Sequence, residues 1–250
     1  MTRFRGTKQF LTRKRLVKVV IALFILGFLA LSTLYIFRRR LLGPRIQRIG
    51  TWFADPSAHS DWQVEGGTRC GDAPMLIPTT GFIGVGWRDG YWPIYQHSGL
   101  DIFSPAGADN VTPNYAAYDG YLTREESWLS TVIIRHPDFP QFEGSPLEPG
   151  EQIWSYYTHM ASTDGTVSYI DEAFPRGTRE KFVEAGTLLG YQGTWSGNPA
   201  NATGLHLHLS IAKSNPDGSY TNETQIENTY DPRPFLGLEM NETGLITCQR

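Results

Sequence analysis

The chain has 250 residues, of which 40% are hydrophobic and 19% charged, and its formal net charge is −3. Residues 1–50 hold 12 of the 22 Lys and Arg and no Asp or Glu, so residues 51–250 carry 10 basic against 25 acidic side chains. Such an acidic body argues against nucleic acid as the partner, because that binding depends on Lys and Arg that neutralise phosphates.

An uncharged apolar run, Val19–Phe37, lies between two basic clusters near the N-terminus. As a helix it would span the roughly 30 Å hydrocarbon core of a bilayer. Arg38, Arg39 and Arg40 follow it directly, with no small-residue cleavage site of the kind that ends a signal peptide. We therefore expect an uncleaved transmembrane signal anchor over 19–37, with a cleavable signal peptide as the alternative. The positive-inside rule weakly favours an extracytoplasmic C-terminal domain.

The two cysteines, Cys70 and Cys248, stand near the two edges of the part of the chain that follows the apolar run. Such a pair is typical of a disulfide in an oxidising compartment, and it would agree with an extracytoplasmic domain. Two unrelated free thiols are the alternative.

Short strand patterns separated by Gly and Pro dominate the rest of the chain. They lie at 82–87, 99–103, 114–123, 131–135, 152–159, 187–192 and 205–212, and only 171–184 has the pattern of a short helix. This spacing predicts an all-β fold of antiparallel sheets in a sandwich or barrel. We divide the chain into a basic tail (1–18), the anchor (19–37), a juxtamembrane spacer that partly packs on the domain (38–78), the main domain (79–240) and a C-terminal tail (241–250).

The strand pattern at 204–211 alternates leucines with small or polar residues. This period of two predicts that the leucines point to one face and that His206 and His208 point to the other, about 6–7 Å apart at their bases. Taken alone, the two histidines fit a metal or catalytic half-site and an ordinary half-exposed strand about equally well.

Two other strand-type segments carry further metal-type ligands. His97 and Asp101 lie four residues apart at the start of one strand, and His159 ends the pattern at 152–159. A catalytic zinc site needs three protein ligands, an open position for water or substrate, and acid or base groups beside it. The five residues together supply that inventory.

Three motifs in this order resemble the lysostaphin-type (LytM-like) zinc endopeptidases of bacterial cell walls: His97-Ser98-Gly99-Leu100-Asp101, Tyr156-Tyr157-Thr158-His159-Met160 and Gly204-Leu205-His206-Leu207-His208-Leu209. Further similar segments extend the resemblance over about residues 80–238. It implies a duplicated-hybrid-motif-like barrel-sandwich fold. It also implies Zn²⁺ held by His97, Asp101 and His208, with His159 and His206 as catalytic residues whose separate roles stay open.

By the same resemblance the expected function is hydrolysis of peptide bonds in peptidoglycan, in stem peptides or cross-bridges. The candidate partners are peptidoglycan or another peptide substrate, the membrane and a regulatory protein. A non-catalytic wall-binding or partner-activating module of the same fold is the first alternative. The second alternative is a non-haem iron site, because such sites also use two histidines and one carboxylate.

The chain departs from the family pattern near the predicted metal strands. Leu205 stands where a proline usually precedes the H-x-H, the loop 193–204 is longer than usual, and 139–150 and 161–179 look like insertions. These departures leave the metal chemistry intact and put the substrate in doubt.

Aromatic residues are dense around these segments: Trp87, Tyr91, Trp92, Tyr95, Trp154, Tyr156 and Trp195. Most of them are expected in the core. Tyr91 or Tyr95 is the candidate for a tyrosine that helps to stabilise the transition state, as the resemblance implies. His136 is expected to cap a strand end, and His59 lies in the spacer, so neither is expected to join the metal set.

Overall fold

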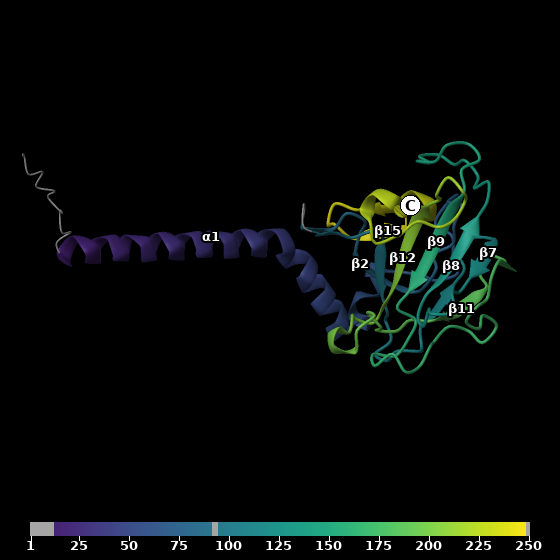
Figure 1. Cartoon of the computed structure of the whole chain (residues 1–250), viewed down its shortest axis with the longest axis horizontal. Helices are drawn as coiled ribbons and strands as arrows, with labels where there is room; N and C mark the ends of the chain where they lie inside the picture. Colours follow the sequence, from purple (N-terminus) through teal and green to yellow (C-terminus); the bar gives the residue numbers. More distant parts are fainter. Residues whose placement is uncertain (1–12, 92–94, 249–250) are drawn as a thin grey trace, which may run out of the picture. The chain divides into compact units, whose positions relative to one another are not determined.

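The computed structural model describes residues 13–91 and 95–248, and within them antiparallel strands dominate (Figure 1). The α-helices of this part are α1 (Arg13–Ala54) and α2 (Arg233–Leu236), and 3-10 helices cover Ser57–Trp62, Pro199–Asn201 and Ile226–Asn228. The strands are β1 (Gln63–Val64), β2 (Gly81–Val85), β3 (Gly90–Tyr91), β4 (Tyr95–Gln96), β5 (Leu100–Phe103), β6 (Pro113–Tyr115), β7 (Gly120–Thr123), β8 (Val132–His136), β9 (Ile153–Thr158), β10 (Lys181–Val183), β11 (Leu188–Tyr191), β12 (His206–Lys213), β13 (Thr229–Tyr230), β14 (Leu238–Met240) and β15 (Ile246–Cys248).

The largest sheet has the strand order β1-β2-β5-β12-β9-β8-β7-β10, and β13 pairs with β12 outside this path. Its pairings are antiparallel, and the labelled strands β2, β12, β9, β8 and β7 follow in this order in Figure 1, with β5 between β2 and β12. Smaller two-stranded sheets join β6 to β11, β3 to β4, and β14 to β15. The predicted all-β antiparallel fold with one N-terminal apolar helix is confirmed.

The hydrophobic core lies against one face of this sheet. Leu207, Leu209 and Ile211 of β12 are fully buried in it, which confirms the inward leucine face expected from the alternating pattern. The other side of the same core cluster comes from segments outside the large sheet, such as Ile77 before β2 and Leu189 of β11. Because β12 is buried on both faces and at both edges, its polar side chains are held in fixed surroundings.

The chain divides into two compact units, Met1–Gln47 and Arg48–Arg250, so the border falls within α1. In the first unit, Arg15–Ile36 is long and apolar enough to cross a membrane, by length and composition. A signal sequence would meet the same test. The expected five-part division of the chain therefore stays a prediction.

The end of α1 belongs to the second unit. Ile49, Trp52 and Phe53 follow the i, i+3, i+4 spacing of one helix face, and they contact Phe82 and Phe103. Trp52 is fully buried, and its indole N–H donates a hydrogen bond to the carbonyl of Ser104 (3.0 Å). The helix thus continues to Ala54, into the stretch that we expected to be a spacer.

Two local predictions are wrong. The short helix expected over 171–184 is absent from that described segment, which forms turns and the edge strand β10. Pro175 and Gly177 interrupt the helical pattern, and Gly177 has a φ of +82°. The single strand expected over 114–123 is two strands, β6 and β7, in different sheets, because the chain leaves one sheet for the other between them.

Cys70 and Cys248 form a disulfide, with their Cα atoms 5.2 Å apart. The bond joins the segment after β1 to β15 across a sequence separation of 178 residues. The expected pairing is therefore confirmed, and it closes most of the second unit into one covalent loop.

Candidate metal centre

Strand pairing brings the predicted site residues together from distant parts of the sequence. His208 of β12 lies directly opposite Asp101 of β5 and Thr158 of β9 in the antiparallel registers. Residues opposite each other in a sheet share a face, so the side chains of Asp101 and His208 meet. His97 lies between β4 and β5, four residues before Asp101, and His159 directly follows Thr158 at the end of β9, so both lie within a few residues of the level of His208.

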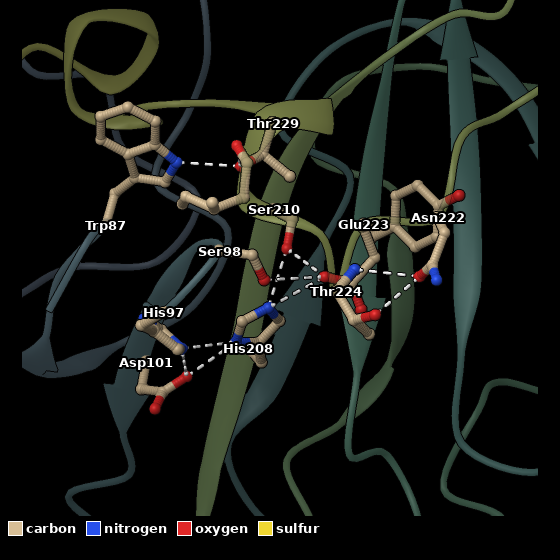
Figure 2. Close-up of polar contacts among 12 residues, drawn as sticks. Trp87, His97, Ser98, Asp101, His208, Ser210, Asn222, Glu223, Thr224 and Thr229 are labelled. Carbon is tan, nitrogen blue, oxygen red and sulfur yellow. Dashed lines mark hydrogen bonds and ion pairs between the residues drawn. The ribbon is translucent and has the colours of Figure 1, made fainter. Parts of the chain in front are cut away.

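The side chains of His97, Asp101 and His208 form a tight cluster (Figure 2). Asp101 Oδ1 lies 2.9 Å from His97 Nε2 and 2.8 Å from His208 Nδ1, and the two nitrogens are 2.9 Å apart. These three donor atoms can hold a metal ion. They are the three residues that the family resemblance implies as ligands.

The ring nitrogens that face away from this cluster have fixed partners. His97 Nδ1 is 3.1 Å from the carbonyl of Gly86, to which it donates, and His208 Nε2 is 2.8 Å from the hydroxyl of Ser210. A carbonyl can only accept, so Nδ1 of His97 carries the hydrogen and Nε2 is left with a lone pair facing the cluster. Such outer contacts orient metal-binding histidines and select their tautomer.

His159 and His206 complete the set of histidines at the cleft. His159 Nδ1 donates to the carbonyl of Trp195 (2.6 Å), and His206 Nδ1 donates to the carbonyl of Gly204 (2.7 Å). With Nδ1 bonded to a carbonyl, Nε2 is the nitrogen of each ring that is left for the cleft, and His206 Nε2 lies 3.4 Å from Asp101 Oδ1. The centres of the two rings are 4.6 Å apart, so the pair can act on one reacting group.

The backbone of His159 has a φ of +73°, an uncommon value for a residue other than glycine. The loop at 161–168 packs against Trp195, whose carbonyl accepts the hydrogen bond from His159 Nδ1. Gly165 packs against the Trp195 indole so closely that a Cβ there would lie 2.6 Å from two ring atoms. This loop and the long loop 193–204 therefore fix the carbonyl that orients the His159 ring.

Burial and charge shift the pKa values of these groups in different directions. Burial raises the pKa of Asp101. Attraction to His206 and hydrogen bonds with His206, His208 and His97 outweigh this effect, and they hold the pKa of Asp101 well below its usual range. Burial lowers the pKa of His208, but Asp101 and Glu223 raise it to about 10. Burial and the neighbouring His206 and His208 lower the pKa of His159 to about 3, so this ring is neutral at pH 7.

The cluster opens into a cleft of about 470 Å³. Its walls beyond the histidines and Asp101 include Tyr95, Phe103, Ser196, Thr203, Gly204 and Thr224. Hydroxyl groups thus line much of the entrance, and Phe103 packs on the ring of His206 with 5.1 Å between ring centres. Of the two candidate tyrosines, Tyr95 lines this cleft, while the side chain of Tyr91 lies outside the described part of the chain.

The other aromatic residues and histidines that lie in the described part of the chain pack or form hydrogen bonds outside the metal cluster. Trp154 and Tyr156 lie in a separate buried cluster, and the Trp87 indole donates to the Thr229 hydroxyl (2.9 Å; Figure 2). Trp92 falls outside the described residues. His136 ends β8 and is buried away from the cleft, and His59 stacks on Trp62.

Sequence reasoning missed Glu223, which lies beside His208 in the cleft (Figure 2). Nothing in the pattern around residue 223 distinguishes it from other surface acids. Ser210 could have been found, because the alternation on β12 places it on the face of the two histidines.

Comparisons with known proteins found no matching family model and no matching curated protein. Similar solved structures include lytM from Ruminococcus gnavus, at 22% identity over 55% of this chain and 45% of that one, with a TM-score of 0.35. Another is the catalytic domain of the prophage-encoded M23 protein EnpA from Enterococcus faecalis, at 20% identity over 63% and 95%, with a TM-score of 0.32. CbpA from L. salivarius REN matches at 17% identity over 56% and 73%, also with a TM-score of 0.32.

The first of these is named as a lytM protein and the second as an M23 protein. The chain spans less than half the length of the lytM protein that it matches.

Proposed function

We propose that this protein is a membrane-anchored zinc metalloendopeptidase that hydrolyses peptide bonds in the stem peptides or cross-bridges of peptidoglycan. One observation carries the proposal: three metal-type donor atoms and the Nε2 atoms of two further histidines converge in a single open cleft. Metal-assisted hydrolysis needs such a set, in which an ion with a free position lies beside groups that accept and return a proton.

The donor set suits Zn²⁺. Two imidazole nitrogens and one carboxylate oxygen are ordinary zinc ligands, and together they leave a fourth tetrahedral position open. His97 Nε2, Asp101 Oδ1 and His208 Nδ1 would hold the ion, while the outer nitrogens of both rings remain bonded to Gly86 and Ser210. When bound, the zinc ion would polarise the scissile carbonyl and lower the pKa of a water to about 7.

In this proposal His159 and His206 move the protons. In its neutral form each ring presents a lone pair on Nε2, because its Nδ1 hydrogen is bonded to a backbone carbonyl. Either ring can therefore accept a proton from the attacking water, but neither can donate a hydrogen bond until it has been protonated. Once protonated, the same nitrogen can donate to the developing oxyanion or to the leaving amine.

A peptide of the cell wall fits the character of the cleft. The entrance is open and its lining includes Ser196 and Thr224, whose hydroxyl groups suit the amide groups of an extended peptide. The sequence motifs supply the link to peptidoglycan. The departures from the family pattern in the loop 193–204 lie in this wall, so that loop is the place where substrate preference would be set.

The proposal can be tested on the full chain purified in detergent. Metal content is measured by elemental analysis, and products from purified peptidoglycan are identified by mass spectrometry. We expect about one zinc per chain and new amino groups in the products. His208→Ala should lose the metal and the cleavage, and His206→Ala should keep the metal and lose the cleavage. The matched control is His59→Ala, a histidine outside the cleft, which should keep both.

Three outcomes would contradict the proposal, and two of them support the alternatives. Zinc-free protein that still binds peptidoglycan would indicate a non-catalytic wall-binding module. Stoichiometric iron with oxygen uptake would indicate an oxygenase-type site, since two histidines and a carboxylate also suit ferrous iron. Zinc-loaded protein that leaves peptidoglycan intact but cleaves other peptides would keep the metallopeptidase and remove the proposed substrate.

We also propose that the apolar helix stays attached as a single-pass anchor and that the cleft lies outside the cytoplasm. The disulfide supports this location, because disulfides persist in oxidising compartments. Protease treatment of intact spheroplasts should remove the second unit and leave a short membrane-bound fragment. A domain that is released without protease, after removal of residues 1–37, would instead indicate a cleaved signal sequence.

A further inference from the structure

We propose that Glu223, acting through the hydroxyl of Ser210, is a positioning residue that fixes the ring of His208 with its Nδ1 lone pair aimed at the metal cluster. The inference deepens the proposed function and rests on it, because it concerns how one of the three donor atoms is prepared. Figure 2 shows the contacts on which it depends.

The direction of each hydrogen bond follows from counting protons. One oxygen of Glu223, Oε2, lies 2.8 Å from Ser210 Oγ and 3.1 Å from Ser98 Oγ, and it accepts from both hydroxyls. Ser210 has a single hydroxyl hydrogen, which this bond uses. Its oxygen, 2.8 Å from His208 Nε2, can then only accept, so Nε2 carries the hydrogen.

This assignment decides which nitrogen of His208 can bind a metal. With its hydrogen on Nε2, the neutral ring keeps a lone pair on Nδ1, the atom that faces Asp101 and His97. With the opposite tautomer, Nδ1–H would point into the cluster and block coordination. The carboxylate of Glu223 also lies 3.4 Å from His208 Nε2, so it favours the hydrogen at that position directly as well.

The surroundings of Glu223 hold it in this position. Its side chain is only 15% exposed, although it belongs to a loop after β12. The Tyr156 hydroxyl donates to the carbonyl of Thr221 (2.6 Å). On the other side, Asn222 accepts from the backbone and hydroxyl of Thr224, as Figure 2 shows, and its carbonyl accepts from Asn228 Nδ2 (3.0 Å).

The same geometry separates Glu223 from the residues that touch the reacting atoms. Its contacts run to Ser98, Ser210 and the outer nitrogen of His208, on the far side of that ring from Asp101. Removing it would therefore leave all three donor atoms in the chain but loosen one of them. Losses of this kind typically cost roughly 10–100-fold in metal affinity.

The test measures zinc affinity of the full chain in detergent by competition with a chromophoric chelator. Glu223→Ala and Ser210→Ala should each weaken binding by roughly 10–100-fold, and the double variant should lose little more than either, since both break one relay. Ser210→Thr and Glu223→Gln keep a hydroxyl and an accepting oxygen, so we expect them to restore most of the affinity. Glu227→Ala, an exposed acid nearby, is the matched control.

A second readout reports on the relay itself. In zinc-loaded protein labelled with ¹⁵N, the Nε2–H of His208 should give a slowly exchanging resonance, because that hydrogen is bonded to Ser210. The resonance should exchange rapidly with water in Ser210→Ala and Glu223→Ala and persist in Glu227→Ala. A variant that had merely failed to fold would lose the dispersed backbone spectrum too.

The outcomes separate this inference from the proposed function. If Glu223→Ala binds zinc within twofold of the unmodified chain, or only raises KM for the peptide, then Glu223 is no positioning residue, whatever the activity. If the chain binds zinc and shows the expected losses but cleaves no peptidoglycan, the inference stands and the substrate is wrong. A chain that binds no zinc would overturn both.

Discussion

Acidification should destabilise this protein through His136, a histidine that lies far from the chemistry. Its side chain is 1% exposed, Nδ1 donates to the carbonyl of Asp119 (2.8 Å), and Nε2 lies 2.8 Å from the hydroxyl of Ser155. Burial lowers the pKa of this ring from 6.5 to about 4, and the bond to Asp119 offsets only part of that effect. The folded state therefore holds His136 neutral where the unfolded chain would protonate it.

The sign and size of the effect follow from linkage. Below pH 6.5 the unfolded chain binds a proton at this position and the folded chain does not, so the contribution of His136 to stability is complete above pH 6.5 and is lost as the pH falls toward 4. A difference of about 2.5 pKa units corresponds to about 3 kcal/mol. His159, with a pKa of about 3, contributes in the same direction.

The assay is urea unfolding of the metal-free full chain in detergent at pH 7.5 and pH 4.5, followed by tryptophan fluorescence. His136→Gln keeps a donor and an acceptor but does not titrate, so it should lose about 2–3 kcal/mol less stability between the two pH values than the unmodified chain does. The comparison cancels the contribution of His159. Equal losses in the two proteins would refute a buried neutral His136.

Three further outcomes are expected. Because the pKa of His208 is about 10 in the metal-free site, zinc binding at pH 7.5 should release about one proton to the buffer. Calorimetry in buffers of different ionisation enthalpy measures this release. A binding heat that is the same in all of these buffers would contradict the prediction. Gly165→Ala should displace the Trp195 indole and, with it, the backbone carbonyl of Trp195 that orients His159. We expect kcat to fall about tenfold or more with the zinc content unchanged. A kcat close to that of the unmodified chain would show that the loop at 161–168 is not needed. Replacing Cys70 and Cys248 with serine should lower stability by about 2–5 kcal/mol, measured by urea unfolding, and no change would mean that the disulfide is dispensable.

Strand positions near the site were predictable because their signals are local. The alternation of leucine and histidine on β12 is a property of eight consecutive residues, and the burial of Leu207 and Leu209 agrees with it. The helix predicted at 171–184 failed for a local reason too, because Pro175 and Gly177 interrupt a helical pattern. Ile49, Trp52 and Phe53 also followed a helical spacing that was visible in the sequence but lay beyond the apolar run.

Local patterns of residues were enough to predict the antiparallel strands, the apolar helix, the residue types of the candidate site and, through its motifs, the family that they resemble. How these residues meet depends on the fold, because strand register places Asp101 opposite His208 across 107 positions of chain. The fold also sets which nitrogen of each histidine faces the cleft, since the partners are backbone carbonyls and side chains that no pattern encodes. Glu223 is the clearest case: an unremarkable acid in the sequence reaches His208 only because the loop after β12 folds back beside it.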